Sequence, residues 1–87
     1  MARDDVIASL RDPTLRISRR KAEILLDLAN GMVTKEIAQA RNLSAHTVAE
    51  YIERLELLLR ARSRAHLISR AYEHGFLPLD QGRFTNY

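Results

Sequence analysis

The sequence predicts an all-α fold, a small helix-turn-helix bundle of four core helices with an additional short N-terminal helix. Two observations lead to this prediction. Apolar residues recur at helical spacing through most of the 87 residues, and Ser or Thr stands before four of these runs, at the position of a helix N-cap. By contrast, no segment alternates polar and apolar residues as a half-buried strand would.

The additional helix is expected near the beginning of the chain. Asp4 and Asp5 lie ahead of an apolar run at helical spacing, in a first turn where the helix dipole favours acidic side chains. Pro13 stops this helix, because it cannot donate a backbone hydrogen bond. We therefore expect residues 1–16 to form a helical N-terminal extension.

Each of the four core helices has a recognisable start. The expected N-caps are Ser18, Thr34, Ser44 and Ser63. Gly31 and Gly75 follow two of the helices, where a residue that tolerates the left-handed backbone conformation is preferred. Pro78 prevents the last helix from resuming. The core domain is therefore expected over residues 17–78, followed by a flexible C-terminal tail over residues 79–87.

The composition is typical of one small globular domain, with 46% hydrophobic and 29% charged residues. The absence of Cys excludes disulfides and thiolate metal sites, and the three His residues have no partners at metal-ligand spacing. No cofactor motif and no nucleophile with its base is recognisable, so we expect neither a cofactor nor an enzyme. Without a membrane span or a signal peptide, the expected location is the cytoplasm.

The net charge of +3 is unevenly distributed. Residues 1–21 carry six basic and three acidic side chains, and residues 61–87 carry four basic and two acidic ones. Residues 22–60 carry four basic and six acidic side chains. A nucleic-acid-binding domain usually concentrates positive charge on the element that reads the bases. Here the flanks are basic and the centre is acidic.

Four segments carry a linked set of motifs. They are Ile17-Ser18-Arg19-Arg20-Lys21-Ala22-Glu23-Ile24-Leu25, Thr34-Lys35-Glu36-Ile37-Ala38, Leu43-Ser44-Ala45-His46-Thr47-Val48 and Arg62-Ser63-Arg64. In that order they resemble the opening helix, the scaffold helix, the start of the recognition helix and the last element of the LuxR/GerE-type DNA-binding domain. The resemblance implies a transcriptional regulator that binds double-stranded DNA, with a homodimer formed by the last helix.

The resemblance and the helical spacing together indicate which residues face DNA. With Val48 at the centre of the buried face, His46, Glu50, Glu53 and Leu57 point outward at ~100° per residue. The expected DNA-binding residues are Lys35, His46, Thr47, Ala49, Glu50, Glu53, Arg54, Arg19 and Arg20. Further cations for the DNA backbone are Arg16, Lys21, Arg41 and Arg60. The expected dimer interface consists of Leu67, Ala71 and His74.

The reading face departs from the family pattern, which commonly has Lys where this chain has Ala49. Glu50 and Glu53 would be repelled by phosphates, by up to ~4 kcal/mol each at ~4 Å and an effective dielectric near 20. Glu can accept a hydrogen bond from cytosine N4, so reading remains possible. The alternative is a protein-interaction module that modulates another regulator through the Glu50, Glu53 and Leu57 face, with weak or no DNA binding.

Overall fold

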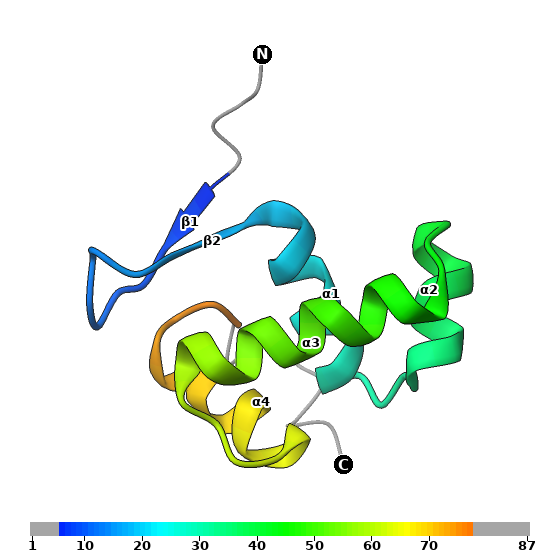
Figure 1. The fold of residues 1–87 in the computed structure, drawn as a ribbon. Helices are drawn as coiled ribbons and strands as arrows, with labels where there is room; N and C mark the ends of the chain where they lie inside the picture. Colours follow the sequence, from blue (N-terminus) through cyan, green and yellow to red (C-terminus); the bar gives the residue numbers. More distant parts are fainter. Residues whose placement is uncertain (1–5, 78–87) are drawn as a thin grey trace, which may run out of the picture.

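The computed structural model describes residues 6–77, which form a two-stranded sheet and a bundle of helices (Figure 1). The elements in chain order are β1 (Val6–Ala8), β2 (Arg16–Ser18), α1 (Arg19–Ala29), α2 (Thr34–Arg41), α3 (Ala45–Leu59) and α4 (Arg64–Glu73). Helix α3 crosses the front of the molecule in Figure 1 and packs against α1, α2 and α4. The four predicted core helices are therefore confirmed.

Serine caps begin three of these helices, as predicted. The hydroxyl of Ser18 accepts a hydrogen bond from the backbone N–H of Lys21, and the hydroxyl of Ser63 accepts one from the N–H of His66. Ser44 caps α3 in the same way. Each cap satisfies a backbone donor that has no partner within its helix.

The start of α2 differs from the prediction. Thr34 is the first residue of the helix, and Val33 occupies the N-cap position. The side chain of Glu36 accepts a hydrogen bond from the backbone N–H of Val33 at 2.9 Å. This carboxylate satisfies a donor at the helix start and lies where the helix dipole favours negative charge.

The predicted N-terminal helix is wrong. Residues 6–8 form β1, which pairs antiparallel with β2 and places Ile7 opposite Ile17. The short apolar run is compatible with either a helix or a strand, and its tertiary partners decide between them. Ile17 is only 2% exposed, so this pairing also fixes the hairpin against the helical core. Asp4, Asp5 and the predicted tail over residues 79–87 lie outside the described residues.

The core consists mainly of aliphatic side chains from all four helices, with Ile17 of β2 and Phe76 after α4. Its fully or almost fully buried members are Ile24, Leu25, Ile37, Val48, Ile52, Leu55, Leu59 and Leu67. On α3 the buried side chains are Val48, Ile52, Leu55 and Leu59, so the buried face expected around Val48 is confirmed. The opposite face of α3 therefore points to solvent.

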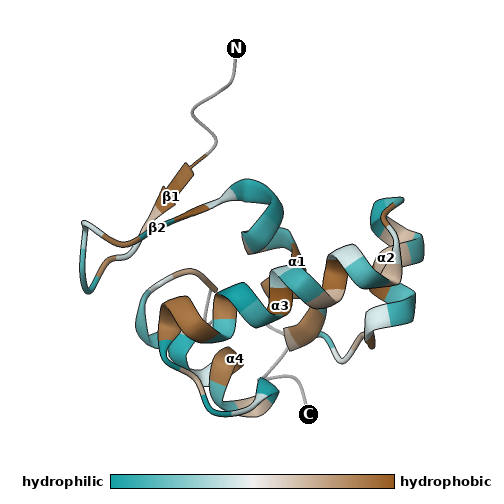
Figure 2. Ribbon diagram, in the orientation of Figure 1, coloured by the Kyte–Doolittle hydropathy of each residue, from teal (hydrophilic) through white to brown (hydrophobic). Residues whose placement is uncertain are grey.

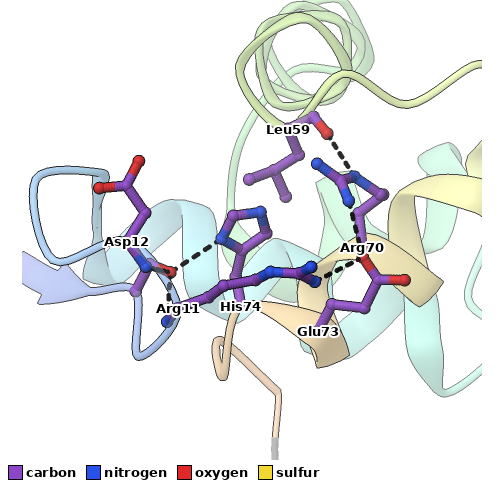
Figure 3. A network of polar contacts seen from close by, with 7 residues as sticks. Arg11, Asp12, Leu59, Arg70, Glu73 and His74 are labelled. Carbon is purple, nitrogen blue, oxygen red and sulfur yellow. Dashed lines mark hydrogen bonds and ion pairs between the residues drawn. The ribbon is translucent and has the colours of Figure 1, made fainter.

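The hairpin is attached to the C-terminal end of α4 (Figure 3). The backbone N–H of Leu10 donates to the carbonyl of His74 at 2.8 Å, and the hydroxyl of Ser9 lies 2.8 Å from His74 Nδ1. Gly75, at φ +81°, lies directly beneath Leu10. A Cβ atom there would come within 2.6 Å of the leucine side chain, so this close approach favours glycine.

Candidate nucleic-acid interface

Helices α2 and α3 form a helix-turn-helix. Helix α2 ends at Asn42, which adopts the left-handed conformation at φ +58°. The next N–H, of Leu43, donates to the carbonyl of Ala38 at 2.8 Å, and Ser44 then caps α3. Residues 42–44 thus reverse the chain in one tight turn, which fixes α2 against the N-terminal half of α3.

The first turn of α3 offers hydrogen-bond donors to an anion. The Ser44 hydroxyl accepts from the Thr47 N–H at 3.0 Å and donates to Thr47 Oγ1 at 2.9 Å. Thr47 Oγ1 is an acceptor in this exchange, so its own hydrogen remains available for a further partner. Together with the N–H groups and the positive end of the helix dipole, this hydroxyl suits a phosphate oxygen.

The outward face of α3 is acidic, and His46 lies close to one of its carboxylates. The side chain of His46 is 82% exposed and that of Glu50 is 51% exposed, and His46 Nε2 lies 3.4 Å from Glu50 Oε2. The two residues are four positions apart, so their side chains meet on one face of the helix. An imidazolium at His46 would offset the charge of Glu50 on this face.

The other predicted contact residues fall into two groups. Ala49 is half-buried and Glu53 and Arg54 are exposed along α3, while Lys35 is exposed in the first turn of α2. These residues form the first group, because they lie on two helices that pack against each other. The second group, at the start of α1, is separate: Figure 1 shows this turn beside β2, well separated from the end of α3 that meets α2. There Arg19 is exposed, and the Nε atom of Arg20 lies 3.9 Å from Glu23.

This arrangement of helices agrees with the comparison with known protein families. The family model described as bacterial regulatory proteins, luxR family, matches residues 15–71. The chain belongs to the luxR family. The matched segment begins just before β2 and ends in α4, so β1 and the loop after it lie outside the family domain.

Two further comparisons support the same assignment. The chain is 39% identical over 61 residues to the transcriptional activator protein ExaE of Pseudomonas putida, covering 70% of this chain and 28% of ExaE. Among solved structures, it resembles a Vibrio cholera VqmA–ligand–DNA complex with a TM-score of 0.66 and 32% identity. That match covers 71% of this chain and 27% of VqmA. The chain therefore spans little more than a quarter of each relative.

Arg41 has a structural role in this luxR-family domain that the sequence reasoning missed. Its Nε and Nη2 atoms donate to the two carboxylate oxygens of Asp27 at 2.8 and 2.9 Å, and its Nη1 lies 3.5 Å from Glu23. The hydrogen bonds that Arg41 donates to Asp27 raise the pKa of the Arg41 guanidinium. The available signal was Asp27 itself, a carboxylate on the buried face of α1 that requires a partner. Arg41 is thus engaged within the fold rather than offered to phosphate.

The predicted dimer interface needs correction. Leu67 and Ala71 have no exposed surface, and His74 is 7% exposed. These side chains face the interior of their own chain, where Leu67 and Ala71 belong to the hydrophobic core. The outward side of α4 presents two exposed small residues flanked by two half-buried ones: Ala65, Ser69, Ile68 and Tyr72.

Within residues 6–77, no helix is long and apolar enough to cross a membrane. The same range holds no cluster of three or more acidic or histidine side chains placed to bind a metal ion.

Proposed function

We propose that this chain binds double-stranded DNA through the N-terminal half of α3 and regulates transcription. The observation that carries the proposal is the first turn of α3, which Ser44 caps directly after α2 and in which the Thr47 hydroxyl keeps its hydrogen for a further partner. The likeness to a structure solved with DNA supports the same mode of binding. In a helix-turn-helix, the N-terminal residues of the second helix contact base edges while the first helix crosses the backbone.

The length of α3 limits which residues reach the groove. At ~1.5 Å per residue, Leu57 lies ~18 Å along the axis from Ala45. The first two turns therefore hold the groove-facing candidates, His46, Ala49 and Glu50. Glu53 and Arg54 lie at the edge of this region.

Phosphate contacts are expected to supply more affinity than base contacts. Thr47 and the N–H groups of α3 provide neutral donors, and Lys35 provides an exposed cation in the first turn of α2. Glu50 and Glu53 oppose binding through repulsion, except where a carboxylate accepts a hydrogen bond from cytosine. The protein is thus expected to bind DNA modestly and to depend strongly on salt.

Fluorescence anisotropy with a labelled duplex tests this mode of binding. Lys35→Gln is expected to weaken binding of all sequences and to reduce the magnitude of the log–log salt slope by ~1 per subunit. Lys21→Gln, which removes a cation in the first turn of α1, is the matched control and is expected to change little. Equal effects of the two substitutions, or no binding at low salt, would contradict the proposed interface.

We further propose that the chain binds DNA as a homodimer through the outward face of α4. The small side chains of Ala65 and Ser69 allow close approach of a second helix, and Ile68 and Tyr72 add apolar surface at its edges. A two-fold axis on this face would bring the same four residues of both subunits together. We propose this face as the dimer interface in place of Leu67, Ala71 and His74, which are buried within the chain.

A second candidate function rests on a different observation at the other end of α3. The side chain of Leu57 is 80% exposed and Leu58 is 40% exposed, and this end of α3 is strongly apolar in Figure 2. Beside it lies a depression of about 400 Å³ lined by Glu53, Glu56, Leu57 and Ala61. An exposed leucine next to two carboxylates suits a protein segment that carries basic and apolar side chains.

Substitution of Leu57 separates the two functions. If this surface only contacts a partner protein, Leu57→Ser leaves DNA affinity unchanged while transcriptional output from a reporter falls. Arg54→Gln, on the same helix nearer the groove, is expected to reduce both. A loss of DNA affinity in Leu57→Ser, with folding intact by circular dichroism, would instead place Leu57 in the DNA interface.

A further inference from the structure

A second depression, of about 360 Å³, lies where the hairpin loop, the end of α3 and α4 come together. Its lining residues are Asp12, Leu15, Leu58, Arg60, Arg70 and His74. They come from segments far apart in the sequence, and the hairpin loop belongs to the part of the chain that precedes the family domain. A volume of this size is at the lower end of small-molecule sites, which begin at ~300 Å³.

His74 supplies a buried hydrogen-bond donor to this pocket. The Ser9 hydroxyl accepts from the N–H groups of Arg11 and Asp12 at 3.0 and 2.9 Å, which uses both of its lone pairs. Its hydrogen must then go to His74 Nδ1, 2.8 Å away. A neutral imidazole with an unprotonated Nδ1 carries its proton on Nε2. His74 Nε2, the ring nitrogen without a dashed line in Figure 3, is therefore a donor.

Two arginines add charge to the same pocket. Arg70 is held by a hydrogen bond from its Nε to the carbonyl of Leu59 at 2.8 Å, and its Nη1 donates to Glu73 at 2.7 Å. Arg60 has no ion pair with any residue between positions 6 and 77. It adopts the left-handed conformation at φ +58°, where Gly or Asn is normally preferred. Its exposed side chain lines the pocket without a carboxylate partner among residues 6–77.

The balance of charges and the apolar wall restrict the ligand. Of the charged residues that line the pocket, Arg60 and Arg70 are basic and Asp12 is acidic, which leaves a surplus of one positive charge. Hydrogen bonds from Thr14 hold the pKa of Asp12 below its ordinary value, so this carboxylate stays charged. The charge of a monoanion therefore matches that of the pocket, and a dianion is disfavoured.

The pocket also has an apolar wall, formed by Leu15 and Leu58, which a purely inorganic ion would leave uncovered.

We propose that this pocket binds a small organic monocarboxylate with a short apolar chain. Its carboxylate would accept hydrogen bonds from His74 Nε2 and the guanidinium groups of Arg60 and Arg70. Its apolar chain would lie against Leu15 and Leu58. Such a ligand would join the hairpin to the end of α3, the helix to which DNA binding is assigned.

Titration of the full chain with hexanoate tests the proposal, followed by amide chemical shifts in two-dimensional NMR. We expect saturable binding with a Kd of about a millimolar, because the ligand is small. The shifts should concentrate on the hairpin loop, the end of α3 and α4. Hexanol, which lacks the charge, and inorganic phosphate, which lacks the apolar chain, should each bind at least ~10-fold more weakly.

Two substitutions separate the charged part of the pocket from its apolar part. Arg60→Gly removes the guanidinium at a position whose backbone favours glycine, so the fold is retained, and hexanoate affinity should fall ~10-fold. Leu58→Ala should weaken hexanoate but leave acetate unchanged. Arg54→Gln, on α3 outside the pocket, is the matched control and should change neither. Equal binding of hexanol and hexanoate, equal effects of Arg54→Gln and Arg60→Gly, or shifts centred on Leu57 would each overturn the proposal.

Discussion

Arg41 lies at the C-terminal end of α2, and its guanidinium ties that helix to α1. The pair that it forms with Asp27 is bidentate and partly buried, with side-chain exposures of 28% for Arg41 and 8% for Asp27. Such a fork fixes orientation as well as distance, which Lys could not do. A residue that resembles a phosphate anchor in the sequence thus positions the scaffold helix of the helix-turn-helix.

Removing the carboxylate of this pair is expected to destabilise the domain. Asp27→Ala leaves Arg41 partly buried without its main partner, and we expect a loss of ~2–3 kcal/mol in the free energy of unfolding. The midpoint of thermal unfolding should fall by roughly 10 °C or more for a domain of this size. Glu23→Ala is the control, because its 3.5 Å pair with Arg41 is half-exposed and should matter little. Similar losses of stability in both variants would show that the bidentate geometry adds nothing to the free energy of unfolding.

Among the individual elements, α3 combines a neutral, donor-rich first turn with acidic side chains further along. Glu50→Gln with Glu53→Gln tests what these carboxylates do. If they only repel phosphates, the double substitution should tighten binding to matched and scrambled duplexes alike. If either reads cytosine, general affinity should rise while the ratio of specific to nonspecific binding falls. Anisotropy titrations with both duplexes measure this, and unchanged affinity for both would remove this face from the DNA interface.

The contact between the hairpin and α4 is expected to weaken in acid. Burial lowers the pKa of His74 from its ordinary value of 6.5, and the positive charges of Arg70 and Arg11 lower it further, against Glu73 and Asp12. The folded state therefore favours the neutral imidazole. The stability that neutral His74 contributes is complete above its ordinary pKa of 6.5, which applies to the unfolded chain. That stability is lost as the pH falls through the lower pKa of His74 in the folded protein.

Thermal unfolding between about pH 7.5 and pH 5 checks this behaviour. The wild-type protein should lose stability over this range, and His74→Gln should be less stable at pH 7.5 but flatter with pH. His46→Gln is the control, since that side chain is 82% exposed and its loss should leave the profile unchanged. A wild-type profile that is flat down to pH 5 would contradict the role given to His74.

Comparison of these elements shows which features the sequence could predict. The caps at Ser18, Ser44 and Ser63 depend on residues within one turn, so local spacing predicted them correctly. The N-terminal strand was mistaken for a helix because its partners lie outside its own short run: Ile7 pairs with Ile17 of β2, and Ser9, just after β1, is tied to His74, 65 residues away. The burial of Leu67, which was expected at a dimer interface, was missed for a similar reason. Whether Leu67 or Ile68 turns inward depends on where α1 and α3 lie, and not on the pattern within α4.

At the scale of the whole molecule, the proposed dimer determines the strength and salt dependence of DNA binding. If each subunit neutralises ~3–4 phosphates, a dimer should show a log–log salt slope of roughly −5 to −7. Light scattering should give twice the 10.0 kDa of one chain. Ile68→Glu, on the outward face of α4, should restore the mass of one chain and halve the slope. A monomeric wild-type protein at tens of micromolar, or an unchanged mass for Ile68→Glu, would reject this interface.

The attachment of the hairpin to α4 also has a kinetic consequence. Most helical contacts form early because they join residues close in sequence, whereas the hydrogen bond from Ser9 to His74 must close a loop of 65 residues. The hairpin is therefore expected to dock last during folding and to open first under native conditions. In amide hydrogen exchange, the N–H of Leu10 should lose protection before those of α3. A carboxylate ligand bound in the pocket between the hairpin and α3 would slow that opening. The ligand would thus lengthen the time for which the hairpin stays docked on α4, without changing the docked structure.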